Sequence, residues 1–303
     1  MKFSVWPNSS RPVSEILELA RLADTEGWHC LWHADHYMPN TGSEAFAPGD
    51  MHECWAMLPA VAAVTERVRL GSLVAPTSVH HPAILANRAA TIDHISNGRL
   101  VLGIGAGWQI NEHHAYGIEL EPPVTRVDRF EEAIQIVRSL FENDRTTFEG
   151  THYTILDAPM DPKPVQTPLP ILVGTASPRM LRITAKHADE WNTWGAPELA
   201  GAGVTKLLAA CERVGRDPAT MRKCAQALVI VTDDSDVVER ARSGGMAART
   251  LAGSVDSIVE QVAGYVDRGF DEFIVPDWAF PGDLDTRHGL LVELFTALTA
   301  AHG

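Results

Sequence analysis

The stretch RLVLGIGAGWQINEHHAYG, residues 99–117, predicts a buried strand that opens into a polar loop. Residues 100–104 form a short apolar run, which is typical of a strand inside a sheet. Glycine occupies every second position, at Gly103, Gly105 and Gly107, and alternate strand residues share one face. A glycine within a strand is costly unless another backbone or a ligand approaches closely. We therefore expect one face of this strand to form the floor of a site for a flat ligand.

Polar and aromatic side chains follow these glycines directly and supply the rim of the expected site. A dinucleotide-binding fingerprint would need a third glycine at position 108, where Trp108 stands, and no helix begins at once. The remaining alternative is a simple bulge or barrel corner. The residues of the rim are Trp108, Gln109, Asn111, Glu112, His113, His114 and Tyr116.

Composition excludes several classes of partner. The chain of 303 residues has a net charge of −14 and no basic block, which argues against nucleic acid and anionic membrane surfaces. It contains no apolar run long enough to cross a bilayer, and its first residues, MKFSVWPNSS, are typical of a strand and a turn. The four cysteines form no CxxC motif, which favours a reducing, cytoplasmic location.

Short apolar strands alternate with amphipathic helices along nearly the whole chain, the pattern of a parallel sheet flanked by helices. A single (β/α)8 barrel over residues 1–303 is the natural closure, with its active site at the carboxyl ends of the strands. Residues 142–169 interrupt the alternation with a hairpin turned at Glu149–Gly150 and a proline-rich crossing. The eight expected strands cover residues 2–6, 28–35, 68–74, 100–104, 170–173, 189–192, 225–231 and 272–275.

The loop after the fifth expected strand, GTASP at residues 174–178, predicts an anion site. Ser177 is placed as the N-cap of a helix and Pro178 as its first residue, so backbone N–H groups point out of the helix end. Arg179 and Arg182 could support a bound anion. The alternative is an ordinary turn between a strand and a helix.

Asp35 and His36 end the second expected strand. Asp35 could orient a ring or hold a hydroxyl group, and His36 could move protons because the unperturbed pKa of histidine is near 6.5. Several further histidines near strand ends raise the alternative of a metal-dependent hydrolase. Such barrels want a His-x-His pair on the first strand, which this chain lacks, so we expect no metal site.

Four stretches together resemble the luciferase-like monooxygenase superfamily, and within it the branch that uses the deazaflavin coenzyme F420. They cover nearly the whole chain in family order, and the second and third are specific in combination. The stretches are EGWHCLWHADHYMP, TERVRLGSLVAPTSVHHPAILANRAATIDHISNGRLVLGIGAGWQINEHHAYGI, PLPILVGTASPRMLRITAKHADEWN and AGSVDSIVEQVAGYVDRGFDEFIV.

The resemblance implies a set of cofactor contacts. A bulge with a non-prolyl cis peptide would lie at Leu73–Val74 and back the ring, and residues 174–177 would hold the phosphate. Sugar-phosphate dehydrogenases of this branch have a glutamate where this chain has Trp108, which argues against a sugar phosphate substrate. The implied cofactor-binding residues are Asp35, Leu73, Val74, Thr77, Gly107, Asn111, Gly174, Thr175, Ala176 and Ser177, and the catalytic candidates are His36, Trp108 and His114.

These observations predict an oxidoreductase that transfers a hydride between F420 and a small, apolar organic substrate. Trp6, Trp108 and Trp194 would wall the substrate pocket. The partner is a small molecule, and the prediction allows a homodimer. Three alternatives stay open: an FMN-dependent monooxygenase on the same barrel, a metal-dependent barrel hydrolase, and a binding protein without turnover.

Overall fold

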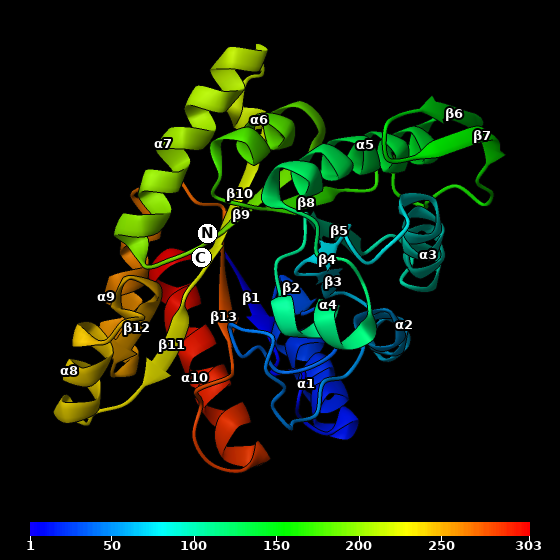
Figure 1. The fold of residues 1–303 in the computed structure, drawn as a ribbon. Coiled ribbons are helices and arrows are strands. Elements are labelled where there is room, and N and C mark those ends of the chain that lie inside the picture. Colours follow the sequence, from blue (N-terminus) through cyan, green and yellow to red (C-terminus); the bar gives the residue numbers. More distant parts are fainter.

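The computed structural model describes all 303 residues and contains a closed barrel of eight parallel strands (Figure 1). The ring closes because β3 pairs with β2 on one side and with β5 on the other. One of the eight strands is interrupted at residues 73–74. Its first part is β3, and its second part, β4, pairs with β5. The barrel strands are β1 (Lys2–Trp6), β2 (Cys30–His33), β3 (Arg69–Ser72), β4 (Ala75–Pro76), β5 (Leu100–Gly105), β8 (Ile171–Gly174), β9 (Glu190–Trp194), β10 (Arg222–Gln226) and β13 (Glu272–Pro276).

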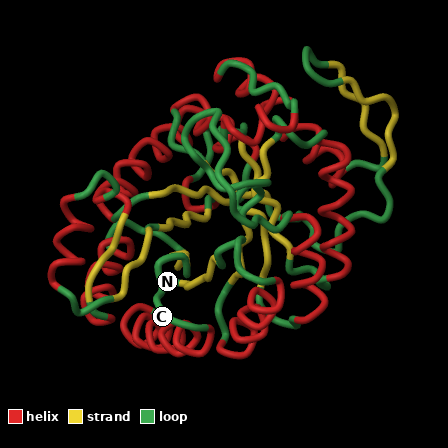
Figure 2. Tube along the Cα trace, turned by 60° about the horizontal axis from the view of Figure 1, so that its bottom comes forward, coloured by secondary structure: helices red, strands yellow, loops and turns green.

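Helices surround the barrel and cover the outer face of its strands, as the predicted (β/α)8 fold requires (Figure 2). Local signals set their ends: Gly27 and Gly215 close α1 and α7 in the left-handed conformation, and Ser254 caps α9 by accepting the N–H of Ser257. The helices are α1 (Val13–Glu26), α2 (Cys54–Val64), α3 (Pro82–Ile95), α4 (Ile110–Tyr116), α5 (Pro123–Glu142), α6 (Pro178–His187), α7 (Pro197–Val214), α8 (Ser235–Ser243), α9 (Val255–Val266) and α10 (Leu284–His302).

The predicted interruption is a hairpin of β6 (Arg145–Glu149) and β7 (Thr154–Pro159) that projects from the barrel beyond α5 (Figure 1). Its turn is tied to α5 by Glu132, whose carboxylate accepts the backbone N–H groups of residues 151–153. The proline-rich crossing then leads back to β8, so the insertion interrupts the chain without dividing the barrel.

The seventh expected strand, residues 225–231, is two strands in the structure. β10 ends at Gln226 within the barrel, whereas β11 (Leu228–Val231) leaves it and pairs in parallel with β12 (Thr250–Gly253) in a separate small sheet. Both segments are apolar, so the sequence pattern could not indicate where the chain leaves the barrel. Helices α8 and α9 both contact β12 of this second sheet.

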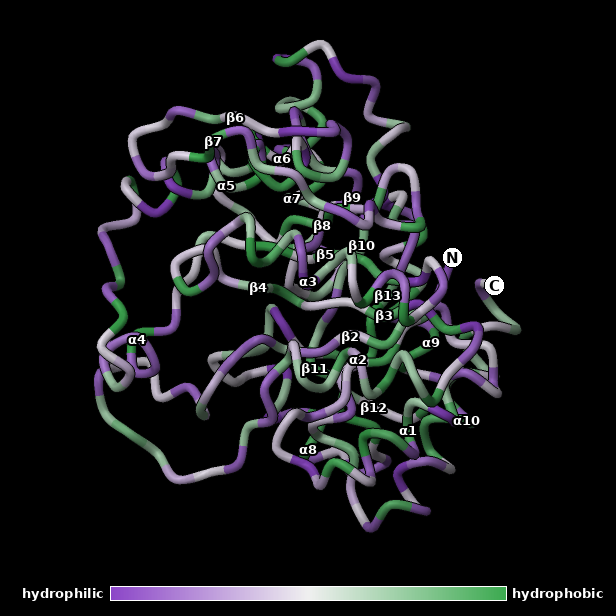
Figure 3. Tube along the Cα trace, turned by 90° about the vertical axis from the view of Figure 1, so that its right-hand side faces the viewer, coloured by the Kyte–Doolittle hydropathy of each residue, from purple (hydrophilic) through white to green (hydrophobic).

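Two apolar regions stabilise the fold. The larger, of 62 buried residues, fills the space between the strands and the surrounding helices. The smaller lies inside the barrel and includes Trp6, Trp32 and Leu73. Figure 3 shows hydrophobic segments along the central strands and hydrophilic stretches in the outer loops. No helix combines the length and the apolar composition needed to cross a membrane.

Candidate active site

A cleft of about 280 Å³ opens at the carboxyl ends of four barrel strands, which are β2, the interrupted strand β3–β4, β5 and β8. This is the end of the barrel at which active sites of this fold lie. The cleft is lined by His36, Val74, Pro76, Gly105, Ala106, Gly107, Trp108, Glu112, Pro123, Arg126, Val127, Gly174, Thr175, Ser177 and Met180.

The break between β3 and β4 contains the expected cis peptide bond between Leu73 and Val74. Leu73 points into the barrel core, where it is 5% exposed, and Val74 lines the cleft. The glycines of β5 accommodate this bulge. A methyl group on Gly103 would overlap the backbone oxygen of Ser72, and one on Gly105 would lie 2.8 Å from Val74 Cγ2.

This packing corrects the expected role of the glycine face. At Gly103 and Gly105 the space that side chains would take is filled by the neighbouring strand, at Ser72 and Val74, and is not open to a ligand. Gly107 lies beyond the strand with a φ of +86°, and a methyl group there would overlap Ser78 Oγ. Gly107 and Gly105 nevertheless line the cleft through their backbone.

The predicted anion loop borders the cleft through Gly174, Thr175 and Ser177. Ser177 is the N-cap residue of α6 and Pro178 is its first residue, but the Ser177 side chain makes no capping hydrogen bond. First-turn N–H groups of a helix have no partner within it, which suits them to bind an anion. Trp191 Nε1 donates to Thr175 O at 2.8 Å and fixes the loop. Ala176 is exposed and lies outside the cleft lining.

The arginine that lines the cleft is Arg126, whereas the sequence analysis expected Arg179 and Arg182 to support an anion there. Arg179 forms ion pairs with Asp128 and Glu131 on α5, and Arg182 is exposed. Arg126, in the first turns of α5, lines the cleft instead and donates from Nη1 to Gly107 O at 2.5 Å. Its Nε is buried without a hydrogen-bond partner. No local sequence pattern indicates Arg126, because only the closed barrel brings α5 to the cleft.

His36 lies in the cleft and is held by Glu112 from α4. Its Nδ1 is 3.0 Å from Glu112 Oε1, and the Glu112 side chain is 2% exposed. The imidazole and the ring of Trp108 form a T-shaped pair, with ring centroids 5.4 Å apart and planes at 85°. Glu112 stood within the sequence cluster at 108–116 but was not singled out as a site residue.

Three implied cofactor residues are buried beside the cleft, and each has one oxygen without a hydrogen-bond partner: Asp35 Oδ1, Thr77 Oγ1 and Asn111 Oδ1. The other oxygen of Asp35 accepts from Trp55 Nε1 and His80 Nε2, both at 2.8 Å. Asn111 Nδ2 donates to Pro39 O at 2.8 Å. Buried oxygens without partners are costly, so such atoms mark places where a ligand can supply donors.

The remaining catalytic candidates separate. Trp108 lines the cleft and is 56% exposed. His114 is exposed outside the cleft lining, where its ring stacks on Phe46. His113 is buried between Gln109 O and Ser78 Oγ, at 2.7 and 2.8 Å, and this pairing is structural.

Trp6 and Trp194 lie at the ends of β1 and β9 and contact each other and Trp278. Together with Val74 they belong to the apolar region inside the barrel or pack against it, and only Val74 of this group lines the cleft. The indole nitrogens of all three are buried without acceptors. This tryptophan cluster is therefore an apolar wall that still has hydrogen-bond donors to offer.

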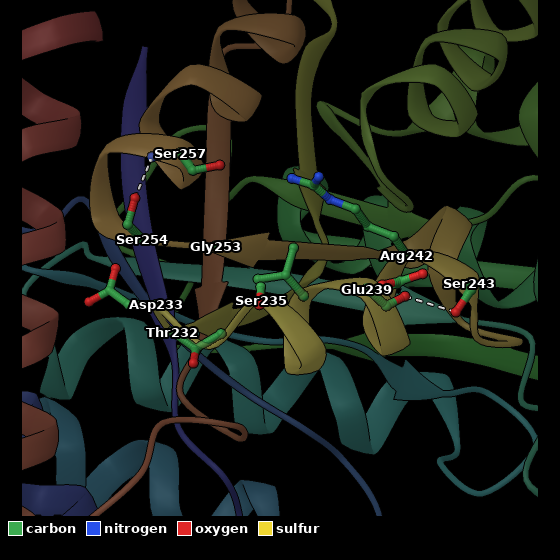
Figure 4. A pocket seen from close by; sticks show the side chains of 10 residues that line it. Thr232, Asp233, Ser235, Glu239, Arg242, Ser243, Gly253, Ser254 and Ser257 are labelled. Atoms are coloured by element: carbon green, nitrogen blue, oxygen red, sulfur yellow. Dashed lines mark hydrogen bonds between the residues drawn. The ribbon is translucent and has the colours of Figure 1, made fainter.

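A second, more open hollow lies between α8 and the start of α9 (Figure 4). Its polar groups are largely satisfied locally: Ser254 Oγ accepts the N–H of Ser257, and Ser243 Oγ donates to Glu239 O. Because Asp233, Glu239 and Arg242 around it are exposed, it offers no buried group awaiting a ligand.

The barrel and the position of this cleft define a barrel enzyme with its site at the carboxyl face, and the comparisons identify its family. Residues 1–248 match the family model described as luciferase-like monooxygenase, so the chain belongs to this family of oxidoreductases.

Two kinds of relatives agree with this membership. An F420-dependent glucose-6-phosphate dehydrogenase of Amycolatopsis mediterranei is 33% identical over 178 residues, 58% of this chain and 51% of the relative. The chain thus spans about half the length of the curated relatives it matches first.

Solved structures share the fold over the full length. An F420-dependent secondary alcohol dehydrogenase in complex with an F420–acetone adduct superposes with a TM-score of 0.84 at 21% identity, covering 98% of this chain and 99% of the other. The coenzyme F420-dependent tetrahydromethanopterin reductase of Methanopyrus kandleri gives 0.81 at 17% identity, covering 97% and 98%.

Proposed function

We propose that this protein is an F420-dependent oxidoreductase that exchanges a hydride with a small organic alcohol or the corresponding carbonyl compound. The observation that carries the proposal is that one cleft joins the loop Gly174–Ser177 at the start of α6, the predicted anion site, to a histidine held by a buried carboxylate. The first element suits a phosphorylated cofactor, and the second suits the proton that must move when a hydroxyl group becomes a carbonyl group.

The residues present fit a bound deazaflavin. Gly174 leaves the cleft open beside Val74, because a methyl group there would already lie 3.3 Å from Val74 Cγ1. The N–H groups at the start of α6, with Arg126 across the cleft, would hold the phosphate. The unpartnered oxygens of Asp35, Thr77 and Asn111 would accept from N–H or O–H groups of the cofactor.

The bound cofactor would supply hydride transfer, and the protein's share is binding, orientation and exclusion of water. His36 would exchange the substrate's hydroxyl proton through Nε2, which has no protein partner. Val74 would offer an apolar surface to the substrate's carbon skeleton, and the tryptophan cluster of Trp6, Trp194 and Trp278 would continue that surface into the barrel. The presence of Trp108 at the edge of His36 favours a small apolar substrate over a sugar phosphate.

The test compares cofactors on one preparation. We expect F420 to bind more tightly than FMN in equilibrium titrations, and NADP⁺ to show no saturable binding. Stronger binding of FMN, with FMN-dependent oxygen consumption, would replace the proposal by a flavin monooxygenase.

Gly174→Val sharpens the test. The branched side chain would crowd Val74 and narrow the phosphate loop, so F420 affinity should fall about tenfold to a hundredfold, the equivalent of about 1–3 kcal/mol of overpacking. Gly245→Val is the matched control, because nothing lies within 4 Å of a side chain there. Unchanged affinity in Gly174→Val, with circular dichroism confirming the fold, would place the phosphate elsewhere.

A further inference from the structure

We propose that Glu112 is a positioning residue that fixes the tautomer of His36, so that Nε2 faces the cleft as a proton acceptor. The inference deepens the proposed function and rests on it for its chemical consequence, but its structural part stands on the contacts of Glu112 alone.

The two oxygens of Glu112 have separate tasks. Oε2 accepts the backbone N–H of Tyr37 at 2.9 Å, and Oε1 lies 3.0 Å from His36 Nδ1. The carboxylate is therefore clamped on two consecutive residues of the loop that follows β2. Its side chain is 2% exposed, so no water competes freely for either oxygen.

The rest of α4 holds the same loop. Gln109 Nε2 donates to Met38 O at 2.9 Å, and Asn111 Nδ2 donates to Pro39 O at 2.8 Å. Together with Glu112, these side chains bind four consecutive residues, 36–39, to the start of one helix. His36 is consequently pre-positioned, with the ring of Trp108 in a T-shaped arrangement beside it.

The tautomer follows from the chemistry of the partner. A carboxylate only accepts hydrogen bonds, so His36 Nδ1 must carry the proton and donate it. In the neutral ring Nε2 then has a lone pair, and no protein group uses it. The side chain of His36 is 20% exposed and lines the cleft.

This arrangement suits the oxidation of an alcohol. Bound oxidised F420 would supply the acceptor for the hydride, that is, the carbinol hydrogen with the electron pair of its C–H bond, and the O–H bond would break as the C=O bond forms. The hydroxyl proton goes to His36 Nε2, and the imidazolium that results keeps its Nδ1–H on the carboxylate of Glu112. In carbonyl reduction the same proton returns to the oxygen.

Glu112→Gln is the discriminating variant because it keeps the shape and changes one atom. The Tyr37 N–H still needs an acceptor, so the amide oxygen is retained there and the NH₂ group turns to His36. Nδ1 must then accept and the proton must move to Nε2. Glu119→Gln is the matched control, since Glu119 is exposed in the loop after α4.

The first measurement needs no substrate or cofactor. Imidazole ¹⁵N chemical shifts of His36, assigned by comparison with His36→Asn, should report Nδ1–H in the wild type and Nε2–H in Glu112→Gln, with Glu119→Gln unchanged. An Nε2–H tautomer in the wild type, or the same tautomer in both proteins, would overturn the proposal.

The second measurement separates this inference from the proposed function. F420 affinity of Glu112→Gln should stay within about threefold of the wild type, while kcat for alcohol oxidation should fall about a hundredfold, the usual weight of a general base. If F420 fails to bind the wild type, the proposed function fails and the tautomer result still decides the role of Glu112. A full kcat in a variant with the inverted tautomer would contradict the positioning role.

Discussion

The buried polar groups at the two ends of the barrel differ in the hydrogen-bond and ion-pair partners they have. At the amino-terminal end of the strands, charges lie against opposite charges: Arg69 donates to Glu190 at 2.6 Å, and Arg222 contacts Glu272 at 3.2 Å. His29 accepts from both arginines, at 3.1 and 2.7 Å. At the carboxyl end, Asp35, Thr77 and Asn111 keep oxygens without partners, and three indole N–H groups have no acceptor.

The difference separates stability from function. In this fold the bottom of the barrel carries residues that stabilise it, and the top carries those that bind and react. Removing one partner of a buried pair lowers the stability of the fold strongly, because the other partner stays buried without it. A buried polar group without a partner is tolerated where a ligand supplies the missing hydrogen bond. Substitutions at the bottom should therefore change unfolding, and substitutions at the top should change binding.

Glu272→Ala should have the largest effect. Glu272 is fully buried and accepts from Ser4 Oγ and Trp32 Nε1 besides contacting Arg222, so its removal leaves two buried donors unsatisfied and takes away the carboxylate nearest to the Arg222 guanidinium. The free energy of unfolding should fall by about 3–5 kcal/mol in urea titrations. Glu260→Ala, at an exposed helix position, should change it by less than about 0.5 kcal/mol. A loss below about 1 kcal/mol for Glu272→Ala would contradict the stabilising role of this end.

Gly107→Leu should come next, and it acts at the opposite end. The leucine would collide with Ser78, displace it from His113, and occupy a left-handed φ, so it should distort the cleft rim. F420 affinity should fall about tenfold to a hundredfold, corresponding to about 1–3 kcal/mol.

Two variants sharpen this comparison. Gly117→Leu carries the same left-handed strain, with φ at +66°, but meets nothing within 4 Å, so it should leave cofactor affinity unchanged. Trp108→Ala should keep affinity within about threefold and chiefly change which alcohols react, because Trp108 is largely exposed at the cleft. Loss of the cofactor in Trp108→Ala, but not in Gly107→Leu, would reverse the assignment of these two residues.

The last prediction, an effect smaller than that of Glu272→Ala, is a pH dependence at the bottom of the barrel. Burial, with Arg222 and Arg69 beside the ring, lowers the pKa of His29 to about 3. The unfolded chain, with an ordinary pKa near 6.5, binds this proton more readily, so the contribution is complete above pH 6.5 and is lost as the pH falls toward 3.

Between pH 7 and pH 5 this should cost about 2 kcal/mol of unfolding free energy in the wild type. His29→Gln, which keeps an acceptor for the arginines, should lack this component. The check is the difference between the two proteins in urea titrations at both pH values, and equal losses would show that another group is responsible.

The sequence by itself determined the elements with strong local signals. Helix α7 covers residues 197–214, and its ends follow from Pro197 at its first position and Gly215 just after its last. The alternation of strands and helices predicted the barrel, and the motif around Leu73–Val74 predicted the cis peptide through the family resemblance. The start of α6 after the loop at 174–178 follows from Ser177 and Pro178, which act over a few residues, and the anion site in this loop stays a prediction.

Only the tertiary structure decided which distant groups meet. Glu112 reaches His36 across 76 positions, Arg126 replaces Arg179 at the cleft, and Ser72 and Val74 fill the space left by the glycines of β5. β11 leaves the barrel for β12, although its apolar pattern matches that of a barrel strand. Periodicity and capping act within a few residues, whereas these contacts depend on the closure of the whole barrel and on competition among several similar partners.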